Sequence, residues 1–269
     1  MRIGITQKAL PAQDLPEAFG QAAQLGAEGI EIDYPSAGMA AAIARPRHAE
    51  QLKAAAEASG VAVASLCLTF LRNEPALIGR PETIERNVDF IIRALGCAAA
   101  VGAAMVTLPF FGKNTIEVED ELSRATGALM DLVEHAEEAG VVLVVESTLP
   151  FHRQDFLLAQ LGKTGNVKVC CNTAVAAARK LDAPTDLRKL GINDLAMVRF
   201  KDVKIVEGAQ PDYAVPLGAG NVDFGAVVQA LRALGYDGWA MVDPSSVGDK
   251  PSLGAAQTAI EFVANLLKN

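Results

Sequence analysis

The sequence is short of the residues that bind nucleic acid. Aromatic residues make up 5% of its 269 residues, and the 24 lysines and arginines are outnumbered by 32 aspartates and glutamates, giving a net charge of −8. Nucleic-acid binding requires a cationic face, and the chain contains no basic run. The sequence therefore predicts no nucleic-acid partner.

Cysteine and histidine are also scarce. The four cysteines, Cys67, Cys97, Cys170 and Cys171, lack the spacing of a metal site, so we interpret them as small buried hydrophobic residues in a reducing cytoplasm. Of the three histidines, His152 is the one that closely follows a predicted strand, where its side chain can reach a pocket. A structural or solvent-facing role is the alternative for His152.

Membrane-type segments are missing as well. The first residues lack the apolar core of a signal peptide. Residues 94–112 carry no charge over a membrane-spanning length, but alanine and glycine dominate this stretch and Gly102 and Pro109 interrupt it. We therefore expect the end of a helix followed by a buried strand, and no membrane partner.

What the chain does contain is a repeated pattern of short apolar runs. Several of these runs are almost continuously apolar, which is typical of strands that are buried on both faces of a parallel sheet. Eight such runs recur, at residues 2–6, 29–32, 61–68, 105–109, 141–145, 167–171, 196–200 and 239–242.

Helical patterns lie between many of these runs. Gly140 and Gly235 are predicted to end two of the helices, and Asp223 is a candidate N-cap. Pro184 and Gly191 break the region between the sixth and seventh runs, which predicts short helical pieces there. Eight strand–helix units in one chain favour a single-domain (β/α)₈ TIM barrel over residues 1–269. No GxGxxG follows the first strand, which weakens the alternative of an open dinucleotide-binding sheet.

Four polar residues stand at the ends of successive predicted strands: Glu146, Asn172, Arg199 and Asp243. The carboxyl ends of the strands are where a TIM barrel builds its active site. Alternation places Arg199 on the same side of its strand as Lys201, and such interior charges are costly unless they are paired. Helix caps, turn residues and a structural ion pair are the alternative interpretations of these four residues.

The order of several segments resembles the xylose-isomerase-like TIM barrels, a superfamily that includes sugar and sugar-phosphate isomerases and epimerases. These segments are GAEGIEID, VVLVVES, VKVCCNT, RFKD, LGAGNVDF and GYDGWAMVD, and together they extend over most of the chain. The resemblance implies a barrel that acts on a small sugar-like substrate. It also implies self-association, so a homo-oligomer is expected.

Typical members of this superfamily bind one divalent metal through Glu, Asp, His and Glu at the strand ends. The corresponding residues here are Glu146, Asn172, Arg199 and Asp243, so the first alone is retained. A guanidinium cannot ligate a metal. We therefore expect no cofactor and hypothesise that Arg199 replaces the metal by pairing with Glu146 and Asp243 or by gripping an anionic substrate. A weak Mn, Mg or Zn site at Glu146, Asn172 and Asp243 is the alternative.

The resulting prediction is a cytoplasmic enzyme of carbohydrate metabolism. It would isomerise or epimerise a sugar, sugar acid or sugar phosphate by proton transfer next to a carbonyl. A non-catalytic barrel that binds a sugar or sugar acid is the alternative, and three histidines are too few for the abasic-site endonuclease branch. The predicted catalytic residues are Glu146, Asp243 and Arg199, and the predicted substrate-binding residues are Asn172, Lys201 and His152.

Overall fold

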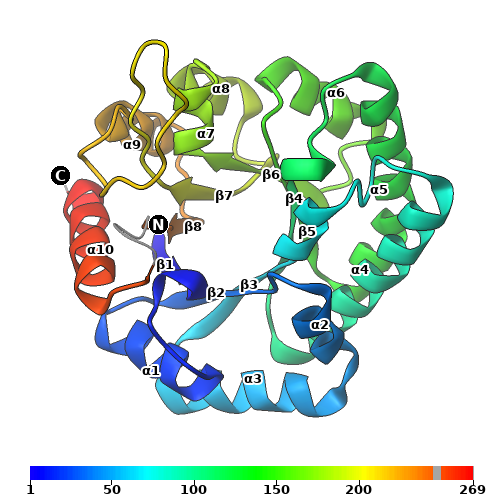
Figure 1. The fold of residues 1–269 in the computed structure, drawn as a ribbon, viewed down its shortest axis with the longest axis horizontal. Coiled ribbons are helices and arrows are strands. Elements are labelled where there is room, and N and C mark those ends of the chain that lie inside the picture. Colours follow the sequence, from blue (N-terminus) through cyan, green and yellow to red (C-terminus); the bar gives the residue numbers. More distant parts are fainter. Residues whose placement is uncertain (245–249, 269) are drawn as a thin grey trace. The chain divides into compact units, whose positions relative to one another are not determined.

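The computed structural model describes residues 1–244 and 250–268, and its strands form a closed parallel barrel in the order of the sequence (Figure 1). Each predicted apolar run forms a strand, so the predicted TIM barrel is confirmed. The strands are β1 Arg2–Thr6, β2 Gly29–Asp33, β3 Ala62–Cys67, β4 Met105–Phe110, β5 Val142–Ser147, β6 Val167–Asn172, β7 Leu195–Phe200 and β8 Trp239–Val242.

Helices follow the strands, and their ends lie where the sequence places them. Gly140 caps α5 in the left-handed conformation, with φ 63°, which glycine adopts without steric cost. The region broken by Pro184 and Gly191 forms two short helices, α7 and α8. The helices are α1 Leu15–Gln24, α2 Ala37–Ala40, α3 Pro46–Ser59, α4 Pro81–Val101, α5 Glu119–Ala139, α6 Phe151–Gln160, α7 Thr173–Ala178, α8 Ala183–Leu190, α9 Phe224–Ala233 and α10 Leu253–Lys268. Short 3₁₀ turns are η1 Gln7–Ala9, η2 Ala41–Ala44, η3 Thr69–Asn73 and η4 Gly112–Asn114.

The chain divides into two compact units. The first unit comprises residues 1–31, 55–62 and 171–269, and the second comprises residues 32–54 and 63–170. In the first unit, β8 pairs with both β1 and β7, and the red helix α10 of Figure 1 packs against α9, β1 and β8. In the second unit, β4 pairs with β3 and β5, and α4 packs against α5.

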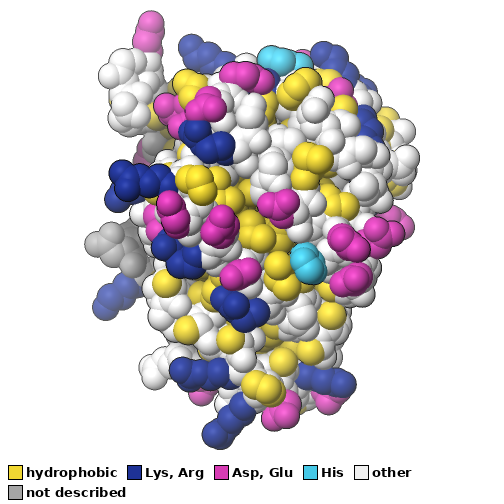
Figure 2. Space-filling model, turned by 90° about the vertical axis from the view of Figure 1, so that its right-hand side faces the viewer, with side chains coloured by type: hydrophobic (Ala, Val, Ile, Leu, Met, Phe, Trp, Pro, Cys, Tyr) yellow, Lys and Arg dark blue, Asp and Glu magenta, His cyan; other side chains and the backbone are white. Residues whose placement is uncertain are grey.

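The uncharged stretch at residues 94–112 is the end of α4 followed by β4, as predicted. No helix within the described residues is long and apolar enough to cross a membrane. The cysteines are unbridged, and Cys67, Cys97 and Cys170 are buried while Cys171 is half-buried, which agrees with their interpretation as small core residues. The face shown in Figure 2 carries lysine and arginine side chains interspersed with aspartate and glutamate.

Candidate functional site

A buried ion pair lies inside the first unit, at the carboxyl ends of its strands. Arg199 on β7 donates from Nη1 to Glu31 Oε1 at 2.8 Å and from Nη2 to Glu31 Oε2 at 3.3 Å. Both side chains are 3% exposed. Glu31 lies on β2, and the order of the barrel puts β8 and β1 between β7 and β2. The pair therefore joins two strands that are not neighbours in the sheet.

Alternation along the strands explains why both charges point inward. Arg199 lies between Val198 and Phe200, and Phe200 faces the outer layer, where its ring stacks on Phe224 of α9 at 5.9 Å. Sequence reasoning did not select Glu31, although it lies between two apolar residues of a buried strand in the same way. Pairing of Arg199 had been expected with Glu146 and Asp243. The pairing with Asp243 is confirmed, with Asp243 Oδ2 3.8 Å from Arg199 Nη1, and Glu31 is a further, bidentate partner that the sequence did not indicate. The pairing with Glu146 stays a prediction.

Asp243 is the second buried carboxylate of this unit, and three cations surround one of its oxygens. Oδ2 lies 2.9 Å from Lys8 Nζ, 3.6 Å from Lys201 Nζ and 3.8 Å from Arg199 Nη1. Burial by itself would raise the pKa of Asp243, but the charges of Lys8, Lys201 and Arg199 and the hydrogen bond from Lys8 outweigh it. The pKa therefore lies well below its ordinary value, and the carboxylate stays ionised. We call Lys8, Glu31, Arg199, Lys201 and Asp243 the mouth cluster.

Lys201 is held in place through its backbone. The Thr173 hydroxyl, at the start of α7, lies 2.5 Å from the Lys201 carbonyl oxygen and 3.2 Å from the Arg199 carbonyl oxygen, and it lies 3.1 Å from the Lys201 amide nitrogen. The side chain is 20% exposed and ends beside Asp243. The prediction that Arg199 and Lys201 lie on one side of their strand is thereby confirmed.

The remaining predicted site residues have different surroundings. Glu146 is buried near the end of β5, in the second unit. Asn172 is the N-cap of α7 and accepts a hydrogen bond from the Val175 amide at 3.2 Å, a role that the sequence analysis did not assign to it. His152 is exposed on α6. Catalytic and substrate-binding roles for these residues stay predictions.

Asp202, which follows the mouth cluster residue Lys201, anchors a long loop before α9. Its carboxylate is almost fully buried and accepts hydrogen bonds from four backbone amides at distances of 2.8 to 3.2 Å. A side chain at Gly220 would collide with Asp202 and would lie 2.5 Å from the Val203 carbonyl oxygen. The four amides are those of Val203, Gly218, Gly220 and Val222.

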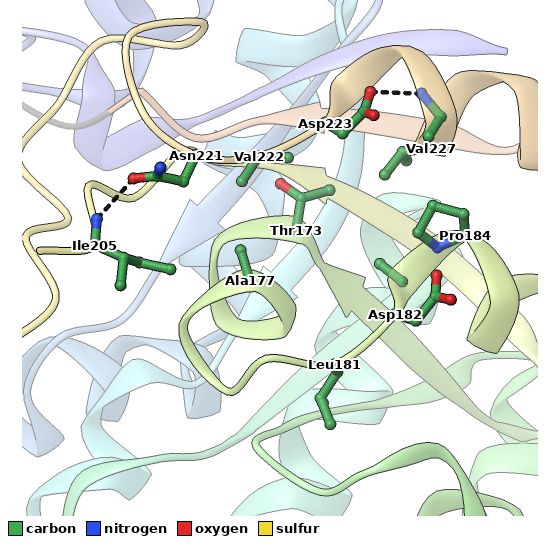
Figure 3. A pocket seen from close by; sticks show the side chains of 12 residues that line it. Thr173, Ala177, Leu181, Asp182, Pro184, Ile205, Asn221, Val222, Asp223 and Val227 are labelled. Atoms are coloured by element: carbon green, nitrogen blue, oxygen red, sulfur yellow. Dashed lines mark hydrogen bonds between the residues drawn. The ribbon is translucent and has the colours of Figure 1, made fainter. Parts of the chain in front are cut away.

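A pocket of about 370 Å³ opens between the two short helices and this loop (Figure 3). Figure 3 shows Asn221 turned toward Ile205, whose amide donates to Asn221 Oδ1 at 2.8 Å, and Asp223 capping α9 through the Ala226 amide. Thr173, which supports Lys201, also lines the pocket. Asp223 is thereby confirmed as an N-cap.

Metal-binding side chains do not gather in the part of the chain that the structure describes. No group of three or more histidine, cysteine, aspartate or glutamate side chains there is placed to hold an ion. The mouth cluster instead combines two carboxylates with three cations. Its chemistry is that of ion pairing and of anion or hydroxyl recognition.

A closed eight-stranded barrel with charged residues at its carboxyl ends defines the class of TIM-barrel proteins that build their sites at that face. The chain belongs to the xylose isomerase-like TIM barrel family, whose model matches residues 19–266.

Several relatives in this family are epimerases. The chain is 30% identical over 161 residues to a 2-epi-5-epi-valiolone 7-phosphate 2-epimerase of Actinoplanes sp., a match that covers 60% of this chain and 58% of that enzyme. It is 29% identical to the putative L-ribulose-5-phosphate 3-epimerase SgbU of Escherichia coli, with 90% and 88% of the two chains covered. The crystal structure of a xylose isomerase domain protein from Planctomyces limnophilus superposes with a TM-score of 0.80 at 18% identity, covering 100% of this chain and 97% of that one, and supports the fold.

Proposed function

We propose that the protein is an epimerase or isomerase of a sugar, sugar acid or sugar phosphate that works without a divalent metal. The observation that carries this proposal is the buried Arg199–Glu31 pair at the carboxyl ends of the strands. Membership of a family whose relatives include sugar-phosphate epimerases supports the proposed reaction class, which is proton transfer at a carbon next to a carbonyl.

The side chains of the mouth cluster are unsuited to bind a divalent metal, which supports a metal-independent reaction. A divalent ion of this kind prefers carboxylate oxygen and imidazole nitrogen. Arg199 stands at a ligand position of the family and engages Glu31 with both ends of its fork. Lys8 and Lys201 lie beside Asp243 Oδ2, where they would repel a divalent cation. These side chains do not fit a metal site at Asp243.

Roles are proposed separately for Glu146, from its position in the family pattern, and for the residues of the mouth cluster. Glu146 is the proposed base that removes the proton next to the carbonyl. Arg199 would stabilise the negative charge that develops on the carbonyl oxygen, since a fixed positive charge acts strongly where water is excluded. Asp243 has a lowered pKa and is therefore a weak proton acceptor at rest, so we give it the task of orienting Lys8 and Lys201. A proton delivered from water to the opposite face of the carbon gives an epimer, and the proton taken by Glu146 passes to the solvent.

Solvent exchange in heavy water tests this proposal. We expect L-ribulose 5-phosphate to gain deuterium at a carbon next to its carbonyl when it is incubated with the protein in excess EDTA, as followed by NMR. Glu146→Gln should slow this exchange by roughly 10² to 10⁴-fold, because an amide cannot accept the proton. Glu138→Gln, at an exposed position of α5, is the matched control and should exchange at the wild-type rate.

Two results would contradict the proposal in different ways. Exchange that EDTA stops and Mn²⁺ restores would show a metal-dependent enzyme. Binding of sugars with no exchange, across both phosphorylated and neutral ketoses, would show the non-catalytic barrel that the sequence left open as the alternative.

A further inference from the structure

Two buried oxygens of the first unit have no hydrogen-bonding partner among the residues that the structure describes, 1–244 and 250–268. They are Thr6 Oγ1, at the end of β1, and Asp243 Oδ1, directly after β8. Thr6 is 1% exposed and Asp243 is 2% exposed, and the two oxygens do not bond to each other. Buried polar atoms normally have a partner, so this pair points to a group that binds here.

Strand register places the two oxygens in one layer of the barrel interior. Thr6 is paired with Glu31 of β2, whose side chain points inward to the ion pair. On the other side of β1, Ile5 is paired with Val242. Thr6 and Asp243 are the next residue on each strand and are therefore neighbours. Since neighbouring residues of adjacent strands point to the same face, the side chains of Thr6 and Asp243 both point inward.

The layer below this pair is apolar. Met241 lies two residues before Asp243, on the same side of β8, and is paired with Gly4 of β1. A Cβ at Gly4 would lie 2.8 Å from Met241 Cε, so the methionine side chain fills the space that the glycine leaves. A thioether has no hydrogen to donate. A partner for Asp243 Oδ1 is therefore expected to come from the mouth of the barrel.

The hydrogen-bonding properties of the two oxygens match those of a hydroxyl group. Asp243 is ionised, so its Oδ1 can accept a hydrogen bond but cannot donate one. The Thr6 hydroxyl can donate as well as accept. A ligand hydroxyl between them would donate its hydrogen to Asp243 Oδ1 and accept a hydrogen bond from Thr6. A carbonyl or ether oxygen has no hydrogen and can bond to Thr6 alone.

We propose that Thr6 Oγ1 and Asp243 Oδ1 bind one hydroxyl group of the substrate, which makes Thr6 a specificity-determining residue. This inference rests on the proposed function, because it adds a residue and a subsite to the same site. A compound that lacks this hydroxyl would leave the carboxylate oxygen buried without a partner. Sites that are built around a substrate hydroxyl reject such analogues strongly.

Titration calorimetry with L-ribulose 5-phosphate tests the role of Thr6. Thr6→Val removes the hydroxyl but keeps the branched shape, and it should weaken binding roughly 2- to 10-fold, the size of one hydrogen bond between neutral groups. Thr6→Ser keeps the hydroxyl and should retain most of the affinity. Thr126→Val is the matched control, because Thr126 is a buried threonine of α5 whose hydroxyl donates to the Leu122 carbonyl oxygen. Equal affinities of Thr6→Val and the wild type would overturn the proposal.

Deoxy analogues identify the hydroxyl that the pair binds. Among analogues of L-ribulose 5-phosphate that lack the hydroxyl at C1, C3 or C4, one should bind the wild type roughly 10- to 100-fold more weakly, because it loses a hydrogen bond to a charged group. The same analogue should lose no further affinity in Thr6→Val, whereas the other two should lose as much as the parent compound. Equal losses for all three would show that Thr6 supports the site without contacting a hydroxyl, which contradicts the proposal.

The stability of the free protein should change in the opposite direction. Thr6→Val removes a buried oxygen that has no protein partner, so the Tm measured without ligand should rise by about 1 to 4 °C. Thr126→Val loses a hydroxyl that already has a partner and should not raise the Tm. A lower Tm for Thr6→Val would show that this hydroxyl stabilises the free protein, and such a structural role would overturn the proposal.

The inference and the proposed function fail in different ways. In the exchange assay, Thr6→Val should raise KM by the factor seen in binding and change kcat little. Binding that depends on Thr6 without deuterium exchange would defeat the proposed function alone. Exchange with the same KM in Thr6→Val and the wild type would defeat this inference alone. A wild type that binds none of these ligands would contradict both.

Discussion

Replacing Arg199 with methionine is expected to lower the free energy of unfolding by about 3 to 5 kcal/mol. The reason is that Glu31 would stay buried without its bidentate partner, and an uncompensated buried carboxylate is strongly destabilising. Chemical denaturation in urea at neutral pH measures the change directly. The decrease in the free energy of unfolding should exceed the decrease expected from lost packing of the arginine stem. The unpaired, desolvated carboxylate of Glu31 accounts for most of the decrease.

A second substitution separates the charge effect from packing. Arg199→Met combined with Glu31→Met should recover most of the lost stability, since both charges are then gone and the volume is largely kept. Lys163→Met is the control: its pair with Asp155 is nearly half exposed on both sides and should contribute less than about 1 kcal/mol. A double variant as unstable as the single one would show that the ion pair is not the source of the effect.

The substitution Asp202→Ala should destabilise the loop before α9 and cost at least about 3 kcal/mol, since hydrogen bonds to a charged group are each worth about 1.5 to 3 kcal/mol. Four backbone amides lose their acceptor at once in this variant. Hydrogen exchange followed by NMR should show loss of protection at Gly218, Gly220 and Val222. Global stability is read from urea denaturation.

Asp223→Ala is the matched control for this experiment. Asp223 is also an aspartate of this region, but it caps α9 through one amide, so its loss should cost about 1 kcal/mol and leave Gly218 and Gly220 protected. Gly220→Ala disturbs the same contact from the loop, because the added Cβ would collide with the Asp202 carboxylate and the Val203 carbonyl oxygen. Equal effects of Asp202→Ala and Asp223→Ala would refute the anchoring role of Asp202.

The barrel could be predicted from the sequence because its signals are local. Apolar runs of strand length, glycines such as Gly140 at helix ends and the cap at Asp223 each depend on a few neighbouring residues. The positions of Arg199 and Lys201 on one side of β7 followed from alternation alone. Strand ends varied by one or two residues, as is usual for such boundaries.

The partners of the charged residues could not be predicted in the same way. Glu31 and Arg199 are 168 residues apart in sequence, and which inward carboxylate meets the guanidinium depends on side-chain reach across the barrel interior. Glu146 and Asp243 were selected because they end apolar runs, whereas Glu31 lies inside one and was missed. Lys8 lies in a short turn with no pattern of its own, and its contact with Asp243 is visible in three dimensions alone.

The Arg199–Glu31 pair also constrains how this site can change over evolutionary time. Replacement of Arg199 by histidine would leave the buried carboxylate of Glu31 on β2 without its bidentate partner, so this single change would be unfavourable even if a site with both positions changed is functional. A change at Glu31 would have to come before the change at Arg199 or together with it. Laboratory selection for a metal-using variant should therefore succeed from libraries that vary Glu31 and Arg199 together and fail from those that vary Arg199 alone.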